Sequence, residues 1–311
     1  MEAGRRFLAG ARDGCGWWRD WDTQAGVSDE WTTAYTAAVL AAGPERTARD
    51  SARQALELLC SRRPSKDGWG YNQHVPPDAD TTICVCRLAR AVNRAADVAP
   101  ALSFLERCLR PDGGLATYAS QEGVRRSMHW KRGASFRGWL ASHACVTAAA
   151  AALPEFGARP VVHAYLRRAQ DSDGHWDGYW WPDPEYATAL AVEALREHGA
   201  AADLPALRAA LAWTRTLPGR RSAFALACRI RILRFDDPET CRELAGTLAE
   251  LQNSDGSWPS SARIRIPPPD FVDPSAIWNW DYERKDIYSI RLDQNRIFTT
   301  AAVLEALQLL P

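Results

Sequence analysis

Apolar residues recur at helical spacing along most of the chain, and short polar turns separate the apolar segments. Six segments are rich in alanine and other small residues: Thr32–Ala42, Thr81–Val92, His143–Leu153, Tyr186–Glu197, Ser222–Ile232 and Phe298–Leu310. Longer amphipathic segments precede several of them, as at Arg46–Ser61, Pro160–Gln170 and Pro238–Gln252. Small side chains suit close packing at a crowded centre, while an amphipathic helix covers a core from outside. The pattern therefore predicts helical pairs with the small-residue helix inside.

A polar Asp-Gly turn recurs between these helices. It begins at Asp13, Asp67, Asp112, Asp173 and Asp255. The last interval is long enough for one more unit, whose turn falls at Leu217–Arg220. Self-similarity at a period of tens of residues is typical of helical repeat architectures. Six helical pairs predict an all-α fold, an (α/α)6 barrel in a single domain of residues 1–311, with an open solenoid as the alternative.

Composition narrows the possible functions. Lys+Arg and Asp+Glu are equal at 38 each, so no charge excess indicates nucleic-acid binding. Neither a membrane-spanning apolar run nor the apolar region of a signal peptide is present, which favours a cytoplasmic protein. The 14 tryptophans are unusual, and most stand in or beside the turns. A tryptophan in such a position is expected to pack on something or to line a cavity.

Two carboxylates, Asp78 and Asp80, stand at the start of one small-residue helix. A helix N-terminus favours negative charge, but two crowded carboxylates do not both ionise cheaply, so one can keep its proton. A carboxyl that stays protonated suits a general acid. The structural alternative is a cap, with Asp80 binding free N–H groups and Asp78 in a turn. The two roles are compatible, because one aspartate could cap while the other acts.

Two of the turns extend to the pattern Q-x-x-x-G-x-W, at Gln170–Trp176 and Gln252–Trp258. This pattern resembles the QW repeat of squalene–hopene and oxidosqualene cyclases and, more loosely, of protein prenyltransferase β subunits. Residues 78–82 (Asp-Ala-Asp-Thr-Thr) resemble the D-x-D-D motif of class II terpene cyclases. They are closer to the D-x-D-T-T motif of single-barrel, drimenyl-diphosphate-synthase-type cyclases. The resemblance implies a terpene cyclase β-type barrel and a cyclisation of an isoprenoid that begins with protonation.

The resemblance also implies roles for individual residues. Asp80 would be the proton donor, and Asp78 would keep it protonated and oriented. Thr81 and Thr82 would hydrogen-bond the carboxylates. His143, which opens the next inner helix, would assist the acid, although it is equally explained as a polar residue at a helix start.

A carbocation is better stabilised by electron-rich aromatic faces than by a base, which would quench it. The aromatic candidates are Trp69, Tyr71, Trp130, Trp139, Trp180 and Trp181. The class I diphosphate-ionising motif is missing, so a prenyl diphosphate such as farnesyl diphosphate would keep its diphosphate. Basic residues that would bind it, unless they are simply solvated, are Arg125, Arg126, Lys131 and Arg132, with Arg284–Arg291 as a second segment. Mg²⁺ would accompany the diphosphate, and no redox cofactor is expected.

Classical class II cyclases form the active site between two barrels, and this chain accounts for one. Either the long loops Leu115–Leu140 and Pro259–Ile297 cover the site, or a second copy or a partner subunit completes it. Contact with a membrane surface would suit an isoprenoid substrate.

Three other interpretations remain. A prenyltransferase β subunit needs a zinc site, but His143 and Cys145 lack a matching Asp-x-Cys partner. A glycan-active (α/α)6 enzyme needs carboxylates on opposite sides of a cleft. A non-catalytic barrel that binds a lipid or a protein would tolerate loss of Asp80.

Overall fold

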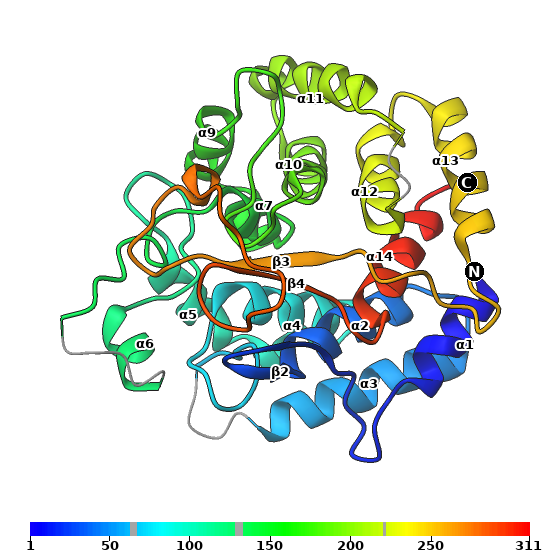
Figure 1. Cartoon of the computed structure of the whole chain (residues 1–311), viewed down its shortest axis with the longest axis horizontal. Helices are drawn as coiled ribbons and strands as arrows, with labels where there is room; N and C mark the ends of the chain where they lie inside the picture. Colours follow the sequence, from blue (N-terminus) through cyan, green and yellow to red (C-terminus); the bar gives the residue numbers. More distant parts are fainter. Residues whose placement is uncertain (63–66, 128–132, 220–221) are drawn as a thin grey trace.

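The computed structural model describes residues 1–311 except 63–66, 128–132 and 220–221. Its helices alternate between an inner and an outer layer (Figure 1). The inner helices are α2 (Glu30–Ala41), α4 (Ala79–Ala91), α7 (Ala144–Ala151), α10 (Pro184–His198), α12 (Ala223–Leu233) and α14 (Ile297–Gln308). Each inner helix packs against the next, and α14 packs against α2, which closes the ring. The small-residue segments therefore form the closed barrel that the sequence predicted.

The outer layer is amphipathic. Its helices are α1 (Glu2–Gly10), α3 (Arg46–Ser61), α5 (Ala101–Cys108), α9 (Pro160–Arg168), α11 (Leu204–Thr216) and α13 (Pro238–Leu251). In α3, for example, Ala52, Leu56 and Leu59 are buried while the charged positions stay accessible. The shorter helices are α6 (Gln121–Ser127), α8 (Pro154–Gly157) and the 3-10 turns η1 (Ala95–Val98), η2 (Ala201–Asp203) and η3 (Pro274–Ala276). Among the described residues, no helix is long and apolar enough to cross a bilayer.

Two small antiparallel hairpins interrupt the helical pattern, and both lie in loops rather than in the core. Strand β1 (Asp20–Thr23) pairs with β2 (Gly26–Ser28). Strand β3 (Arg263–Ile266) pairs with β4 (Ser289–Leu292), with the first residue of β3 opposite the last of β4. In Figure 1 the β3–β4 hairpin crosses in front of the ring of inner helices. The core contains no sheet among the described residues, as the sequence predicted, but these strands were not foreseen.

A recurring arrangement around a buried tryptophan, here called the tryptophan clamp, holds four of the turns. The indole N–H donates over 2.6–2.8 Å to the carbonyl ten residues earlier, in the pairs Trp18–Leu8, Trp69–Leu59, Trp176–Leu166 and Trp258–Leu248. The backbone N–H of the same tryptophan donates to a threonine hydroxyl on the next inner helix, at Thr33, Thr82, Thr188 and Thr300 respectively. Each clamp therefore ties the end of an outer helix to the start of an inner one.

The third unit keeps half of the clamp. Its turn, which begins at Asp112, has no tryptophan, but the backbone N–H of Leu115 donates to the Thr147 hydroxyl over 2.8 Å. The threonine contact is therefore common to five units, and the tryptophan strengthens it in four.

We expect Trp258→Phe to lower the free energy of unfolding by about 1–3 kcal/mol, because the buried carbonyl of Leu248 loses its donor. Urea denaturation of the purified protein measures the change. Trp278→Phe is the control, because Trp278 is 90% exposed; a surface change of this kind is expected to stay within about 0.5 kcal/mol. Equal stabilities for Trp258→Phe and the unchanged protein would contradict a structural role for the clamp.

Candidate active site

A cavity of about 760 Å³ lies at the N-terminal ends of the inner helices. Trp31 at the start of α2, Asp80 at the start of α4 and Trp181 just before α10 line it. Strand β3 supplies Ile264 and Arg265 to the wall. This volume suits a small-molecule ligand, and most of the lining is apolar or aromatic.

Two long loops of the chain cover the cavity and meet at Gly138. The Gly138 backbone N–H donates to the Pro269 carbonyl over 2.8 Å. A Cβ at Gly138 would lie only 1.9 Å from the Phe271 carbonyl oxygen, so no larger residue fits without moving the loops. The Trp139 indole donates to the Pro267 carbonyl over 3.0 Å. Residues from the segments 115–140 and 259–297, which the sequence indicated as a cover, thus form one connected lid.

Asp78 and Asp80 lie together on the cavity wall, in the first turn of α4. Asp78 is the N-cap residue. One of its carboxyl oxygens accepts from the Thr81 backbone N–H over 2.7 Å, and the other accepts from the Thr81 hydroxyl over 3.1 Å. Asp78, and not Asp80 as the capping alternative expected, therefore caps α4, and Asp80 lines the cavity. Thr82 does not bind a carboxylate as expected, because its hydroxyl donates to the Trp69 carbonyl.

The surroundings favour the neutral form of both carboxyls. Burial raises the pKa of Asp78 well above its usual range, and the neighbouring Asp80 raises it further. Burial raises the pKa of Asp80 to about 7. Neither aspartate has an ion-pair partner within the part of the chain that the structure describes. A carboxyl that is half protonated near neutral pH can act as an acid there.

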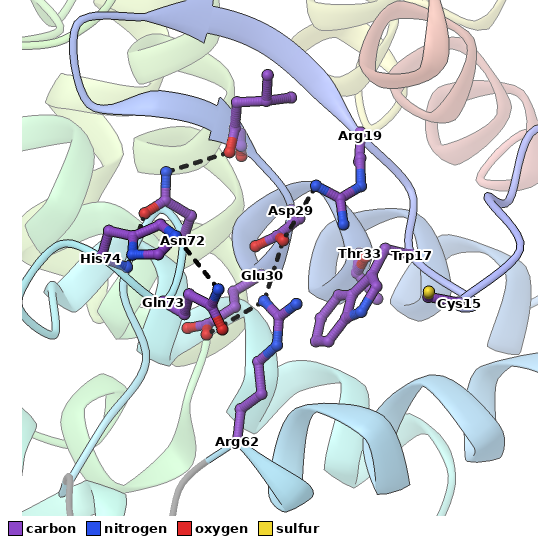
Figure 2. A network of polar contacts seen from close by, with 12 residues as sticks. Cys15, Trp17, Arg19, Asp29, Glu30, Thr33, Arg62, Asn72, Gln73 and His74 are labelled. Carbon is purple, nitrogen blue, oxygen red and sulfur yellow. Dashed lines mark hydrogen bonds and ion pairs between the residues drawn. The ribbon is translucent and has the colours of Figure 1, made fainter.

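Carboxylates at two other inner-helix N-termini are neutralised by arginines. At α2, Arg62 lies 3.0 Å from Asp29 and 3.7 Å from Glu30 (Figure 2). At α10, Arg263 donates to Asp183 over 2.9 Å. The α4 pair differs from both, because it faces the cavity with no such cation among the described residues.

The buried carboxylates at α14 are satisfied in another way. Asp20 accepts from the backbone N–H groups of Asn295, Ile297 and Phe298. Asp293 accepts from the backbone of Thr299 and Ser261 over 2.9 and 3.0 Å. These groups hold loops to the helix and do not line the cavity. Carboxylates at helix starts are thus common in this barrel, and the α4 pair is set apart by its position on the cavity wall.

His143 lies close to the acid but reaches it through another residue. Its Nε2 is 2.9 Å from the Gly138 carbonyl, and its Nδ1 is 3.0 Å from the Thr117 hydroxyl. Burial lowers the pKa of His143 to about 3, so the ring is neutral. With both nitrogens engaged, His143 is not free to bind zinc, as a prenyltransferase-type site would require. Thr117 lines the cavity together with Asp80, and a hydrogen bond that its hydroxyl donated to the Asp80 carboxylate would lower the pKa of Asp80.

Aromatic side chains surround the rest of the cavity. Of the sequence candidates, those that line it are Tyr71, Trp139, Trp180 and Trp181. Trp31 and Tyr118 also line it but were not among the candidates: Trp31 stands just before the expected helix Thr32–Ala42, and Tyr118 carries no local pattern. Trp69 does not line the cavity, since it belongs to a tryptophan clamp, and Trp130 lies outside the described residues. The ring centroids of Trp139 and Trp180 are 5.6 Å apart, so these two form a continuous aromatic wall.

The basic loop is placed differently from the expectation. Arg125 packs over the Phe136 ring and donates to the Ala134 carbonyl, while Arg126 pairs with Glu122 at the surface. Neither lines the cavity. Lys131 and Arg132 lie outside the described residues. A run of positive charge shows that a loop is basic, but it does not show which way the side chains point.

Arg265 provides a positive charge in the cavity instead. It is 6% exposed, and its guanidinium donates to the backbone carbonyls of Tyr179 (3.0 Å) and Gly178. No carboxylate pairs with it within the described ranges, and burial lowers its pKa. A buried guanidinium with spare donors on a cavity wall can bind an anionic group.

No protein-family model matches the chain. Among curated proteins, labda-7,13-dienyl diphosphate synthase of Streptomyces clavuligerus is 45% identical over 55 residues, which span 18% of this chain and 10% of that protein. Among solved structures, the type II terpene cyclase MstE from Scytonema is 38% identical, with a TM-score of 0.94 over 99% of this chain and 96% of that one.

Two further findings agree with this match. MstE variants have been solved with geranylgeranyl dihydroxybenzoate as substrate and with merosterolic acid A as product. A protein from Actinoplanes is 35% identical, with a TM-score of 0.91 over 99% of this chain and 97% of that one. Since the resemblance to MstE extends over almost the whole of both chains, this chain belongs to the type II terpene cyclase family and is a class II terpene cyclase.

Proposed function

We propose that this enzyme starts the cyclisation of an isoprenoid by protonating an alkene with Asp80. The observation that carries the proposal is the carboxyl pair on α4, which is buried, faces an aromatic cavity and lacks a cation among the described residues. The pair lies in one helical turn and not on opposite sides of a cleft, which disfavours a glycosidase. Because both covering loops belong to this chain, we also infer that residues 1–311 form one catalytic domain.

The hydrogen bonds indicate which aspartate holds the proton. Two carboxyls this close share their protons as a pair. Asp78 accepts two hydrogen bonds from Thr81, and donors favour the charged form of a carboxyl. Although burial and the neighbouring Asp80 raise the pKa of Asp78, these two donors favour placing the pair's single negative charge on Asp78 and its proton on Asp80.

The first chemical step then follows from the geometry. The alkene π electrons take the proton, so a C–H bond forms, the O–H bond of Asp80 breaks, and a tertiary carbocation and a carboxylate result. The N-terminus of α4 stabilises the new carboxylate. Trp139, Trp180 and Trp181 offer aromatic faces to the cation, which have no basic lone pair that would end the reaction early.

The polar head of the substrate is placed at Arg265. Of the described lining residues, it alone is an arginine or a lysine. One guanidinium that already binds two carbonyls matches a single carboxylate better than the several charges of a diphosphate. The first candidate is therefore a prenylated aromatic acid like the dihydroxybenzoate bound by MstE. A prenyl diphosphate such as farnesyl diphosphate, retained through cyclisation, is the second.

Mg²⁺ belongs with the second candidate only. The lining carboxyls are Asp78, Asp80 and Asp286, of which the first two are proposed for the acid and the third is paired with Arg284. These residues do not form a separate Mg²⁺ site, so the ion would enter with a diphosphate. Incubation with geranylgeranyl dihydroxybenzoate and with farnesyl and geranylgeranyl diphosphates plus Mg²⁺, followed by product analysis before and after phosphatase, distinguishes the head groups.

Asp80→Asn is expected to reduce kcat at least about a hundredfold, because it removes the acidic proton while keeping the side-chain size. Turnover and thermal unfolding are measured together. Asp50→Asn on the surface of α3 is the control, with activity expected to stay within about twofold. Activity of Asp80→Asn within a few-fold of the unchanged enzyme would rule out Asp80 as the acid.

The pH dependence follows from the pKa of Asp80. The acid is active when protonated, so kcat/KM should be constant below its pKa of about 7 and fall tenfold per pH unit above it. A pH–rate profile with a substrate that is stable over this pH range measures the fall in kcat/KM. An activity that rises through neutral pH would show that a base, not this acid, limits the reaction.

Arg265→Gln is expected to raise KM roughly tenfold or more with a smaller effect on kcat, because the head group is bound equally in the ground and transition states. Arg126→Gln is the matched control, since Arg126 is exposed and paired with Glu122. The reverse result, with KM raised only in Arg126→Gln, would show that the loop containing Arg126, and not Arg265, binds the head group.

A further inference from the structure

The hydrogen bond between His143 and Gly138 fixes the tautomer of the histidine. A backbone carbonyl can only accept, so Nε2, 2.9 Å from the Gly138 oxygen, carries the proton. Because the ring is neutral, Nδ1 is bare and can only accept. The Gly138 carbonyl is itself held in place, since the N–H of the same residue is bound to the lid at Pro269.

This tautomer sets the direction of the Thr117 hydroxyl. The hydroxyl oxygen lies 3.0 Å from His143 Nδ1 and must donate its one proton there. The Trp180 indole N–H donates to the same oxygen over 2.7 Å, which occupies one lone pair. One lone pair remains, and the only role left to Thr117 toward a third partner is that of acceptor.

The third partner is Asp80. The Thr117 carbonyl accepts from the Ala79 backbone N–H over 2.8 Å, so Thr117 is fixed against the first turn of α4. Both Thr117 and Asp80 line the cavity. A carboxylic acid can donate to the free lone pair of Thr117, whereas a carboxylate there would face a lone pair and be repelled.

We propose that Thr117 is a positioning residue that keeps the catalytic proton on Asp80, by accepting a hydrogen bond from the acid and never donating one to its carboxylate. The proposal rests on the role of Asp80 as general acid. A hydroxyl free to rotate would donate to the carboxylate and make Asp80 release its proton to solvent. The hydrogen bonds that join Gly138, His143 and Thr117 remove that freedom, so the protonated form of Asp80 is favoured in the resting enzyme.

Few other groups near Asp80 change charge around neutral pH. The titratable and charged groups close to Asp80, Thr117 or His143 are Asp78, Cys84, Cys108, Arg110, Tyr118, Cys145 and Tyr179, and His74, Arg265 and Asp286 line the same cavity. Burial raises the pKa of Cys84, Cys108 and Cys145 to about 12 and that of Tyr118 well above its usual range. His74 and Asp286 line the same cavity, so the titration is assigned to Asp80 by the band that is missing in Asp80→Asn.

The test is the sign of a pKa change. The infrared carbonyl band of protonated Asp80 is identified as the band missing in Asp80→Asn and is then titrated in the substrate-free enzyme. Thr117→Val should lower the midpoint by about one unit, a tenfold change in the dissociation constant, because the protonated form loses its acceptor. Thr117→Ser keeps the hydroxyl and should restore the midpoint. Thr188→Val, which removes a buried hydroxyl from a distant tryptophan clamp, should leave it unchanged.

A second variant tests the direction in which the Thr117 hydroxyl donates, without changing Thr117 itself. His143→Phe removes the acceptor, frees the hydroxyl to donate to Asp80, and should also lower the midpoint. A rise or no change in Thr117→Val would overturn the proposal, as would an unchanged midpoint in a folded His143→Phe. These outcomes are independent of turnover: an active Asp80→Asn variant would refute the general acid while leaving the titration interpretable.

Discussion

The hydrogen bonds around each buried tryptophan set the position of the inner helix that follows, and the active site depends on this. Trp69 shows the connection most directly. Its indole binds the end of α3, its carbonyl accepts from the Asp78 backbone over 2.9 Å, and its N–H binds the Thr82 hydroxyl. The residue that closes the turn therefore also orients the backbone of the acid helix. A tryptophan expected to touch the substrate instead holds the helix that carries the carboxyl pair proposed as the acid.

Two arginines of the inner helices, Arg87 and Arg231, pair with Glu305 at a distance from the carboxyl pair of α4. Deeper along the inner helices, Glu305 lies 2.7 Å from Arg87 and 3.2 Å from Arg231, and the Tyr35 hydroxyl donates to it over 2.8 Å. Burial alone would raise the pKa of Glu305, but the two arginines lower it to about 2. Such a paired cluster contributes little net stability, but breaking one partner would leave a buried charge exposed to an apolar core. The same helix, α4, thus carries a neutralised carboxylate network at Arg87 and a carboxyl pair without a described cation at its start.

Local sequence patterns were sufficient for the parts of this protein that depend on neighbours in the chain. Helix spacing, repeated turns and the two aspartates are all short-range signals, and the structure places them as expected. Thr117 and Arg265 are different, because their partners lie far along the chain: Trp180 is 63 residues from Thr117, and Tyr179 is 86 from Arg265. The β3–β4 hairpin joins residues of one long loop, such as Arg263 and Leu292, across a connection longer than a tight turn. Nothing in the composition near these residues distinguishes them from ordinary loop positions.

Under the proposed role of Asp80, an acid that protonates an alkene faces opposing demands, and a site that stays neutral until the substrate reacts would meet both. A raised pKa keeps Asp80 protonated in water, but the same low acidity would make transfer to an alkene harder. The activation free energy of proton transfer is lower when the carboxylate and the carbocation form together, because each is stabilised by a group that does little for the neutral reactants. The helix N-terminus acts on the carboxylate, and the faces of Trp139, Trp180 and Trp181 act on the cation. The covering loops that meet at Gly138 would add to this effect by limiting access of water, since a drier cavity strengthens both interactions and lacks the base that would quench the cation before the rings close.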